Sequence, residues 1–258
     1  DKIPFDKESY QTWLKFLPEI HIKKGLRKDN VWGPAGEEGP CGAANEVYID
    51  GLEVATLVFM EYFCAKDGSL APLLQKGVDV GWGLERVAMM AQDKKNIFET
   101  DLFKSLMEAL PDDLPERQKR IAVDHARGIV FLISDGVRPF NKEAGYILRR
   151  LLRRLIVLAK DGIDPKKLFD LIVEKYQDFY PNLDKNTVDA VFDEEYRKFN
   201  KALKRGLAEL EKFSEISAKN AFKLYESFGL PYEVIKEIGG AKTAALTRED
   251  FDKELETH

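Results

Sequence analysis

The chain is poor in cysteine, histidine and methionine, with two, three and four of these residues among 258. Its cysteines, Cys41 and Cys64, are too few for a disulfide framework, and no second cysteine or histidine stands at zinc-ligand spacing from Cys41. No apolar run approaches the length of a membrane span, no secretory signal opens the chain, and residue 1 is aspartate. These absences predict no metal site, a reducing cytoplasm, and a chain that is processed, truncated or partial.

The composition of 44% hydrophobic and 33% charged residues suits a packed core, in one large or two ordinary domains. The net charge of -5 hides a strong asymmetry. Between Arg117 and Lys160 there are eleven lysines or arginines against three acids, Asp124, Asp135 and Glu143. A basic island in an acidic chain predicts a surface for a polyanion.

The stretch from Gly77 to Met90, GVDVGWGLERVAMM, organises the first part of the chain. Its first half alternates apolar residues with others at the two-residue period of a strand. From Leu84 onwards its apolar residues have helical spacing. The stretch therefore predicts a strand that leads directly into a helix.

An acid and two bare backbone positions follow one another along that strand. Asp79 is succeeded by Gly81 and Gly83, where a flat ligand or a tiny substrate could lie against the main chain. Arg86, in the first turn of the helix, can meet a phosphate or stack on an aromatic ring. A lone G-x-G more often marks a weakened strand, but this combination favours a ligand site.

Other elements of the first part are predicted around this unit. Residues 46–50 and 52–63 indicate antiparallel strands that turn at Asp50-Gly51, with the second strand central in the sheet. Residues 30–41, NVWGPAGEEGPC, indicate a loop without regular structure that could wrap around a ligand. Trp32 in that loop is either a core anchor or a pocket wall. Residues 7–17 predict a surface helix.

The segment PDDLP at residues 111–115 predicts a linker between a domain at 1–112 and another at 116–258. Everything after it has helical patterns, at residues 120–133, 146–160, 165–180, 185–213 and 218–228, the last stopped by Gly229. The predicted fold class is therefore α+β, an antiparallel sheet followed by an α-helical domain.

The helix predicted at residues 146–160, YILRRLLRRLIVLAK, separates apolar and basic residues most clearly. Its apolar residues share one face, and Arg149, Arg150, Arg153 and Arg154 share the other. A solvated basic face needs no ligand. However, four arginines without interleaved acids repel one another, which favours a partner with a phosphate backbone.

Several of these segments resemble one family. DVGWGLERVA resembles motif 3 of class II aminoacyl-tRNA synthetases, with its pattern G-x-G-x-E-R. NVW…GPCG…E, LEVATLVFMEY and NIFETDLF resemble the surrounding segments of the alanyl-tRNA synthetase family. IAVDHARGIVFLISDGVRPFNKEAGYILRRLLRR and AFKLYESFGLP resemble its helical tRNA-recognition domain. The blocks follow the order of that family from about residue 30 to residue 231.

The resemblance implies the C-terminal half of a class II catalytic domain, joined to a helical tRNA-recognition domain. The implied reaction is ATP-dependent activation of alanine to the adenylate, followed by transfer to the terminal adenosine of tRNA(Ala). ATP and Mg²⁺ are the implied cofactors, with Glu37, Glu38 and Glu46 as unranked candidates to hold the metal.

The resemblance also implies roles for single residues in the alanine and ATP site. Arg86 matches the arginine that lies over the adenine ring near the phosphates. Asp79 matches the acid that pairs with the α-ammonium group of alanine. Trp32 matches one wall of the pocket, and Val58 matches a residue beneath the alanine methyl group. Gly81 and Gly83 match the glycines that floor the pocket, and Gly83 also borders ATP.

For the tRNA, Asn141 matches the asparagine that reads the G·U wobble pair of the acceptor stem. The arginines at 149, 150, 153 and 154 are suited to hold phosphates beside it. The family has an aspartate as a second reader, and Ser217 stands at the position aligned with it. A serine can donate and accept a hydrogen bond, but it lacks the charge.

The sequence also departs from the family. Motifs 1 and 2, the editing domain and the oligomerisation domain are absent, and the loop after Trp32 is one residue longer and lacks a second cysteine. Without the motif 2 arginine, the isolated chain is expected to be inactive and to need the N-terminal part of the catalytic domain as a partner. Two alternatives stay open: a tRNA-binding subunit or paralogue without chemistry, and another alanine- or serine-handling class II ligase.

Overall fold

The computed structural model describes all residues except 1–2, 4, 17, 19–29 and 258. The chain forms two compact units, Asp1–Leu102 with the antiparallel sheet, and Phe103–His258, which is helical. The predicted α+β class is thus confirmed. The segment predicted as a linker, residues 111–115, lies inside the second unit, because the preceding helix α3 (Lys104–Glu108) packs on other helices of that unit through buried Leu106.

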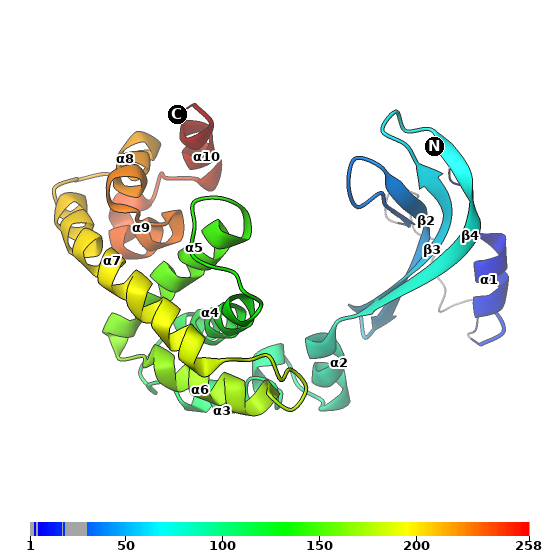
Figure 1. Cartoon of the computed structure of the whole chain (residues 1–258), viewed down its shortest axis with the longest axis horizontal. Coiled ribbons are helices and arrows are strands. Elements are labelled where there is room, and N and C mark those ends of the chain that lie inside the picture. Colours follow the sequence, from blue (N-terminus) through cyan, green and yellow to red (C-terminus); the bar gives the residue numbers. More distant parts are fainter. Residues whose placement is uncertain (1–2, 4, 17, 19–29, 258) are drawn as a thin grey trace. The chain divides into compact units, whose positions relative to one another are not determined.

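Four antiparallel strands form the sheet in the order β1-β2-β3-β4 (Figure 1). They are β1 (Val31–Trp32), β2 (Gly39–Ile49), β3 (Leu52–Cys64) and β4 (Leu70–Trp82). The chain turns between β2 and β3 at Asp50 and Gly51, whose φ angles of 49° and 81° are those of a tight hairpin turn. The predicted hairpin and the central position of β3 are both confirmed.

The expectation of an irregular loop over residues 30–41 is wrong at both ends. Strand β1 pairs with β2, and β2 already begins at Gly39. Gly42 permits the close pairing of β2 with β3, because a Cβ there would lie 1.7 Å from the carbonyl oxygen of Phe59, at a bulge between these strands. The glycines of this segment therefore allow close strand contact as well as turns.

Helix α1 (Lys7–Trp13) is shorter than the predicted 7–17, and Leu17 lies outside the described residues. It begins at Asp6, whose carboxylate accepts a hydrogen bond from the backbone N–H of Ser9 at 2.8 Å. The side chain of Asn45 on β2 donates to the Ser9 hydroxyl at 2.6 Å. The helix covers its face of the sheet only in part, because a cavity of about 370 Å³ remains between them, with an apolar lining of Trp13, Phe16, Leu57, Phe59 and Val78.

The first unit continues with α2 (Leu84–Ala91), directly after β4, and the short turn η3 (Ile97–Glu99). The predicted passage from strand to helix in this stretch is confirmed. The last strand residue is Trp82, so Gly83 is the single residue between the two elements.

The second unit is built around α4 (Glu116–Ser134), α5 (Glu143–Leu158), α6 (Pro165–Tyr176) and α7 (Lys185–Glu211). Helix α7 packs against α4, α5, α6 and α8 (Ala218–Phe228). Apolar side chains with no exposed surface fill the space between them: Ile129, Val130, Leu148, Leu152, Leu155, Phe169 and Leu203. The apolar face predicted for residues 146–160 supplies part of this core, although Ile147 is 42% exposed.

Capping residues define the ends of several of these helices. Asp164, Asp184 and Ser217 accept N–H groups at the starts of α6, α7 and α8. Gly229, in the left-handed conformation with φ 65°, ends α8 as predicted.

Beyond the last helix that the sequence pattern predicts come α9 (Tyr232–Gly239), the turn η5 (Gly240–Thr243) and α10 (Arg248–Thr257), and a further turn, η4 (Ala159–Asp161), follows α5. None of the described helices combines the length and the apolar character that crossing a membrane requires.

Candidate functional site

The strand register gathers predicted pocket residues on one face of the sheet. Asp79 on β4 lies directly opposite Val58 on β3, and Gly81 lies opposite Thr56. Opposite residues of antiparallel strands point to the same face, and so do residues two apart in one strand. The carboxylate of Asp79, the buried Val58 and the bare backbone of Gly81 therefore belong to one surface.

Trp32 joins this surface through β1. It lies opposite Gly42, which lies opposite Met60, and Met60 is two residues along β3 from Val58. Its side chain is 37% exposed, which is unusual for a core anchor. Between the two possibilities that the sequence leaves open, the exposure favours the pocket wall, and that role stays a prediction.

The two glycines after Asp79 have different surroundings. A Cβ on Gly81 would meet no heavy atom within 4 Å, so the surface above it is open. A Cβ on Gly83 would lie 3.3 Å from Cδ of Arg86, so the arginine stem rests on this residue. The N–H of Gly83 donates to the carbonyl oxygen of Val54 at 3.0 Å, which fixes the start of α2 to β3.

Arg86 on α2 is held by one residue of β3. Its Nη1 donates to the carbonyl oxygen of Glu53 at 2.8 Å and lies 3.3 Å from Oε2 of the same residue. The other carboxylate oxygen of Glu53 accepts from the hydroxyl of Thr56 at 3.0 Å. The arginine side chain is 48% exposed, so it stays open to a ligand.

The sequence patterns do not single out Glu53 or Thr56, because each stands inside a strand with apolar neighbours. Only the pairing register of the strands could have identified them, since it sets Thr56 opposite Gly81. Together the surface has an anionic group at Asp79 and a cationic group at Arg86. Such a surface can bind an ammonium group and a phosphate with charge-assisted hydrogen bonds.

The predicted magnesium candidates are not equivalent. Glu37 pairs with Lys66 at 2.7 Å, and both Glu37 and Glu38 are exposed in the loop after β1. Glu46 lies opposite Thr56 and hence on the candidate surface. In the described part of the chain, no three side chains of histidine, cysteine, aspartate or glutamate gather where they could hold a metal ion.

The family model described as tRNA synthetases class II (A) matches residues 2–258. The chain belongs to this family. Alanine–tRNA ligases of Fervidobacterium nodosum and Elusimicrobium minutum are 34% and 37% identical to it over 98% and 96% of its length. The enzyme of Bacteroides thetaiotaomicron is 32% identical over 97%. The resemblance to alanyl-tRNA synthetases is thus confirmed, and the chain spans about a third of the length of these curated relatives.

In this class II (A) synthetase chain, the predicted base reader Asn141 is exposed in the loop between α4 and α5. Ser217, the predicted second reader, is exposed at the N-cap of α8, where its hydroxyl accepts from the N–H of Asn220 at 3.3 Å. The serine thus already has a capping role. Contact of either residue with tRNA stays a prediction.

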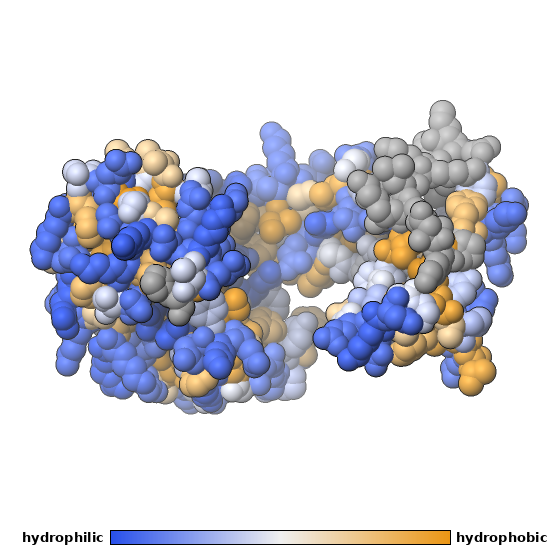
Figure 2. All heavy atoms as spheres, turned by 90° about the horizontal axis from the view of Figure 1, so that it is seen from above, coloured by the Kyte–Doolittle hydropathy of each residue, from blue (hydrophilic) through white to orange (hydrophobic). Residues whose placement is uncertain are grey.

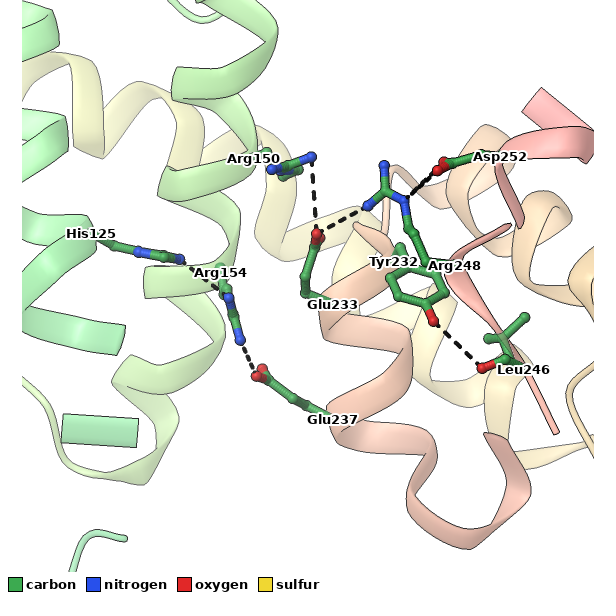
Figure 3. Close-up of polar contacts among 9 residues, drawn as sticks. All are labelled: His125, Arg150, Arg154, Tyr232, Glu233, Glu237, Leu246, Arg248 and Asp252. Carbon is green, nitrogen blue, oxygen red and sulfur yellow. Dashed lines mark hydrogen bonds and ion pairs between the residues drawn. The ribbon is translucent and has the colours of Figure 1, made fainter. Parts of the chain in front are cut away.

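Two of the four predicted phosphate-binding arginines face acids of the same chain, as Figure 3 shows. Nη2 of Arg154 donates to Oε1 of Glu237, and Nη1 of Arg150 lies 3.9 Å from Oε1 of Glu233. Both arginines and both acids are four residues apart, so one face of α5 meets one face of α9. Glu233 is shared with Arg248 on α10, at 3.2 Å.

Arg153 pairs with the most enclosed of these acids, Glu195. Its Nε donates to Glu195 on α7 at 2.6 Å, its Nη1 donates to the carbonyl oxygen of Gly229 at 2.8 Å, and its guanidinium lies 4.8 Å from the centre of the Phe199 ring. The side chains of Arg153 and Glu195 are 16% and 6% exposed. The acids that the local sequence of α5 lacks therefore come from other helices.

These pairs give three arginines a role inside the fold, whatever they do for tRNA. Arg149 differs, because it makes no ion pair with any residue that the structure describes, and its guanidinium lies 6.0 Å from the centre of the Tyr146 ring. Among the four, Arg149 is therefore the best placed for a phosphate.

Tyr225 lies near Arg149. Burial raises the pKa of the Tyr225 hydroxyl, and a hydrogen bond with Tyr146 raises it further.

His125 on α4 is a further residue that the sequence patterns miss. Its Nε2 lies 3.4 Å from Nη1 of Arg154, and its Nδ1 lies 3.4 Å from Oδ2 of Asp124 (Figure 3 shows the first contact). The hydrogen bond with His125 is the main reason why the pKa of Asp124 is lowered. The histidine thus connects α4 to the arginine face of α5.

Proposed function

We propose that the chain is part of an alanine–tRNA ligase, which activates alanine with ATP and transfers it to tRNA(Ala). The observation that carries the proposal is the surface formed by Asp79, Val58 and Gly81, with Arg86 fixed beside it. On this surface the α-ammonium of alanine pairs with Asp79, its methyl group rests on Val58, and the open backbone of Gly81 forms the floor. Catalysis then depends chiefly on positioning and on electrostatic stabilisation of the α-phosphate.

The nucleotide belongs on the side of Arg86. The guanidinium is already oriented by Glu53, which lowers the entropy lost when it stacks on adenine or meets a phosphate. Glu46 and Glu53 would hold a Mg²⁺ ion bound to the phosphates, since such an ion takes only one or two protein carboxylates and these two are the candidates nearest to this surface. When bound, the ion neutralises phosphate charge during adenylate formation.

The change of Asp79 to asparagine tests the alanine site. The variant Asp79→Asn, in the complete catalytic assembly, is expected to raise the KM for alanine at least about thirtyfold in ATP–pyrophosphate exchange, because the ammonium loses its counter-charge. Glu61→Gln is the matched control, since Glu61 lines the cavity on the opposite face of the sheet. An equal loss in both variants, or none in Asp79→Asn, would contradict the assignment.

We infer that further polypeptide completes this unit, so the 258 residues alone do not activate alanine. Within the described residues, β4 pairs with β3 on one side only. Val78, Val80 and Trp82, on the face opposite Asp79, are 62%, 44% and 59% exposed. Alanine-dependent ATP–pyrophosphate exchange after the N-terminal catalytic part is added back would support the ligase. If no exchange activity is found and the chain still binds tRNA, a tRNA-binding subunit without chemistry would be favoured.

For the helical unit we propose recognition of the acceptor stem of tRNA(Ala) and its G·U pair by Asn141, with Ser217 as second contact. The variant Asn141→Ala is expected to bind G·U and G·C acceptor helices with more nearly equal affinity. Arg149→Ala is expected to weaken both alike and to reduce the slope of log Kd against log salt by about one. An Asn141→Ala variant that discriminates like the parent would remove this residue from the reading role.

A further inference from the structure

The loop at residues 137–142, just before α5, presents a large aromatic side chain to solvent. Phe140 is 63% exposed, and no ring of a described residue packs on it. In the helical unit only Phe179 among the described phenylalanines is more exposed, and six others are at least nine-tenths buried. Burial of such a ring against a partner would gain hydrophobic free energy.

The backbone beneath the ring is held firmly. The N–H of Phe140 donates to the carbonyl oxygen of Gly145 at 3.0 Å. Nη1 of Arg138 donates to the carbonyl oxygens of Ile133 and Val137 at 3.2 and 2.9 Å. A Cβ on Gly145 would lie 2.6 Å from Cβ of Phe140, so the loop can approach α5 this closely only over glycine. The ring is thus presented on a preorganised loop.

The charge around the ring indicates what it meets. Residues 137–142 include the cations Arg138 and Lys142 and no acid, and they lie inside the basic island between Arg117 and Lys160. The exposed amide of Asn141 is the next residue along the chain. A partner here must offer negative charge, polar edges for the amide and an apolar surface for the ring. A double-stranded RNA helix offers all three.

We propose that Phe140 packs against ribose rings in the minor groove of the acceptor helix, beside the base pair contacted by Asn141. This inference rests on the proposed function of the helical unit. The major groove of A-form RNA is deep and narrow, whereas its minor groove is wide and shallow and displays the sugars. A phenyl ring has no hydrogen-bonding group, so it adds affinity by excluding water and does not discriminate between bases.

The experiment compares variants of the whole chain in binding to two RNA hairpins that carry the acceptor helix with G·U or G·C. Phe140→Ala is expected to weaken binding to both about fivefold to tenfold, because part of one aromatic side chain is no longer buried. Phe140→Tyr retains the ring and is expected to bind within about twofold of the parent. Phe179→Ala is the matched control, because Phe179 is 81% exposed in a different loop.

Salt dependence separates this contact from a charge effect. The slope of log Kd against log salt is expected to stay unchanged in Phe140→Ala, since no phosphate contact is lost. If Phe140→Ala binds like the parent while Asn141→Ala loses discrimination, the inference fails and the proposed function stands. If Phe140→Ala and Phe179→Ala lose affinity equally, the Phe140 ring makes no specific contact with the acceptor helix and the inference also fails. A parent chain that binds neither hairpin overturns both proposals.

Discussion

The two units of the chain differ in how they treat apolar side chains. Of the 42 buried hydrophobic residues in the described chain, six belong to the sheet unit, although that unit holds eleven of the sixteen exposed large ones. In Figure 2 apolar atoms accordingly form patches on the sheet unit, while the visible face of the helical unit is mostly hydrophilic. The helical unit therefore has a core of its own, and the sheet unit leaves much of its apolar surface in water.

This contrast links stability to function. The candidate alanine and ATP surface lies on the unit with little buried core, and its strand β4 has an unpaired edge among the described residues. Exposed strand edges and apolar patches are features of surfaces that bind another segment. The loop with Asn141, by contrast, is part of a unit whose apolar side chains are mostly buried. Assembly should consequently control activation of alanine more strongly than binding of RNA.

Separation of the units is the strongest test of this contrast. Residues 103–258 alone are expected to unfold in one cooperative thermal transition followed by circular dichroism, because their core is complete. Residues 1–102 alone are expected to show no such transition and to bind a hydrophobic dye, because their apolar surface is uncovered. A cooperative transition in the sheet unit, without dye binding, would break the comparison.

Removal of Arg153 tests whether the helical core depends on its buried ion pair. Arg153→Ala leaves the enclosed carboxylate of Glu195 without a partner, so a loss of about 3–5 kcal/mol in the free energy of unfolding is expected. Replacement of both residues by methionine is expected to recover most of this loss. Urea unfolding provides the measurement.

Arg149→Ala serves as the control for that change, because Arg149 lacks an ion pair among the described residues. It is expected to alter the free energy of unfolding by no more than about 0.5 kcal/mol. If Arg153→Ala and Arg149→Ala lower the free energy of unfolding equally, the ion pair with Glu195 makes no special contribution to stability.

A smaller effect is expected at the start of α7. Hydrogen bonds from the hydroxyl and then the N–H of Thr187 lower the pKa of Asp184. The ionised carboxylate therefore stabilises the fold above its ordinary pKa of 3.8, and this contribution is lost as the pH falls through the lowered value. Asp184→Asn keeps a capping oxygen but does not titrate.

The melting temperatures of Asp184→Asn and the parent, measured from pH 7 to pH 2.5, provide the check. The parent is expected to melt slightly higher at neutral pH, and the difference is expected to vanish in acid. A difference that is the same at every pH would contradict the assigned origin of the lowered pKa.

Local patterns predicted the elements that local forces determine. The hairpin at Asp50-Gly51, the passage from β4 to α2 and the apolar face of α5 all follow from turn chemistry and periodicity. The pairing of β1 with β2 was not predictable, because β1 has only two residues. Short strands of two residues leave no periodic signal.

The candidate site was predictable in its residues but not in its contacts. Asp79, Gly81 and Arg86 stand together in the sequence, whereas Glu53 reaches Arg86 only through the strand register. The same limit applies to α5, whose arginines lack acids nearby in the sequence and find them on α7 and α9. Long-range electrostatic partners depend on tertiary packing, which periodicity does not report.

The pairing of α5 with α9 has a consequence for selectivity. Glu233 and Glu237 neutralise two guanidinium groups that would otherwise attract any polyanion. A shortened version of the chain that ends before α9 would unmask both charges and bind unrelated nucleic acids and heparin more tightly. Such a gain would show that the C-terminal helices limit non-specific binding by neutralising these two charges.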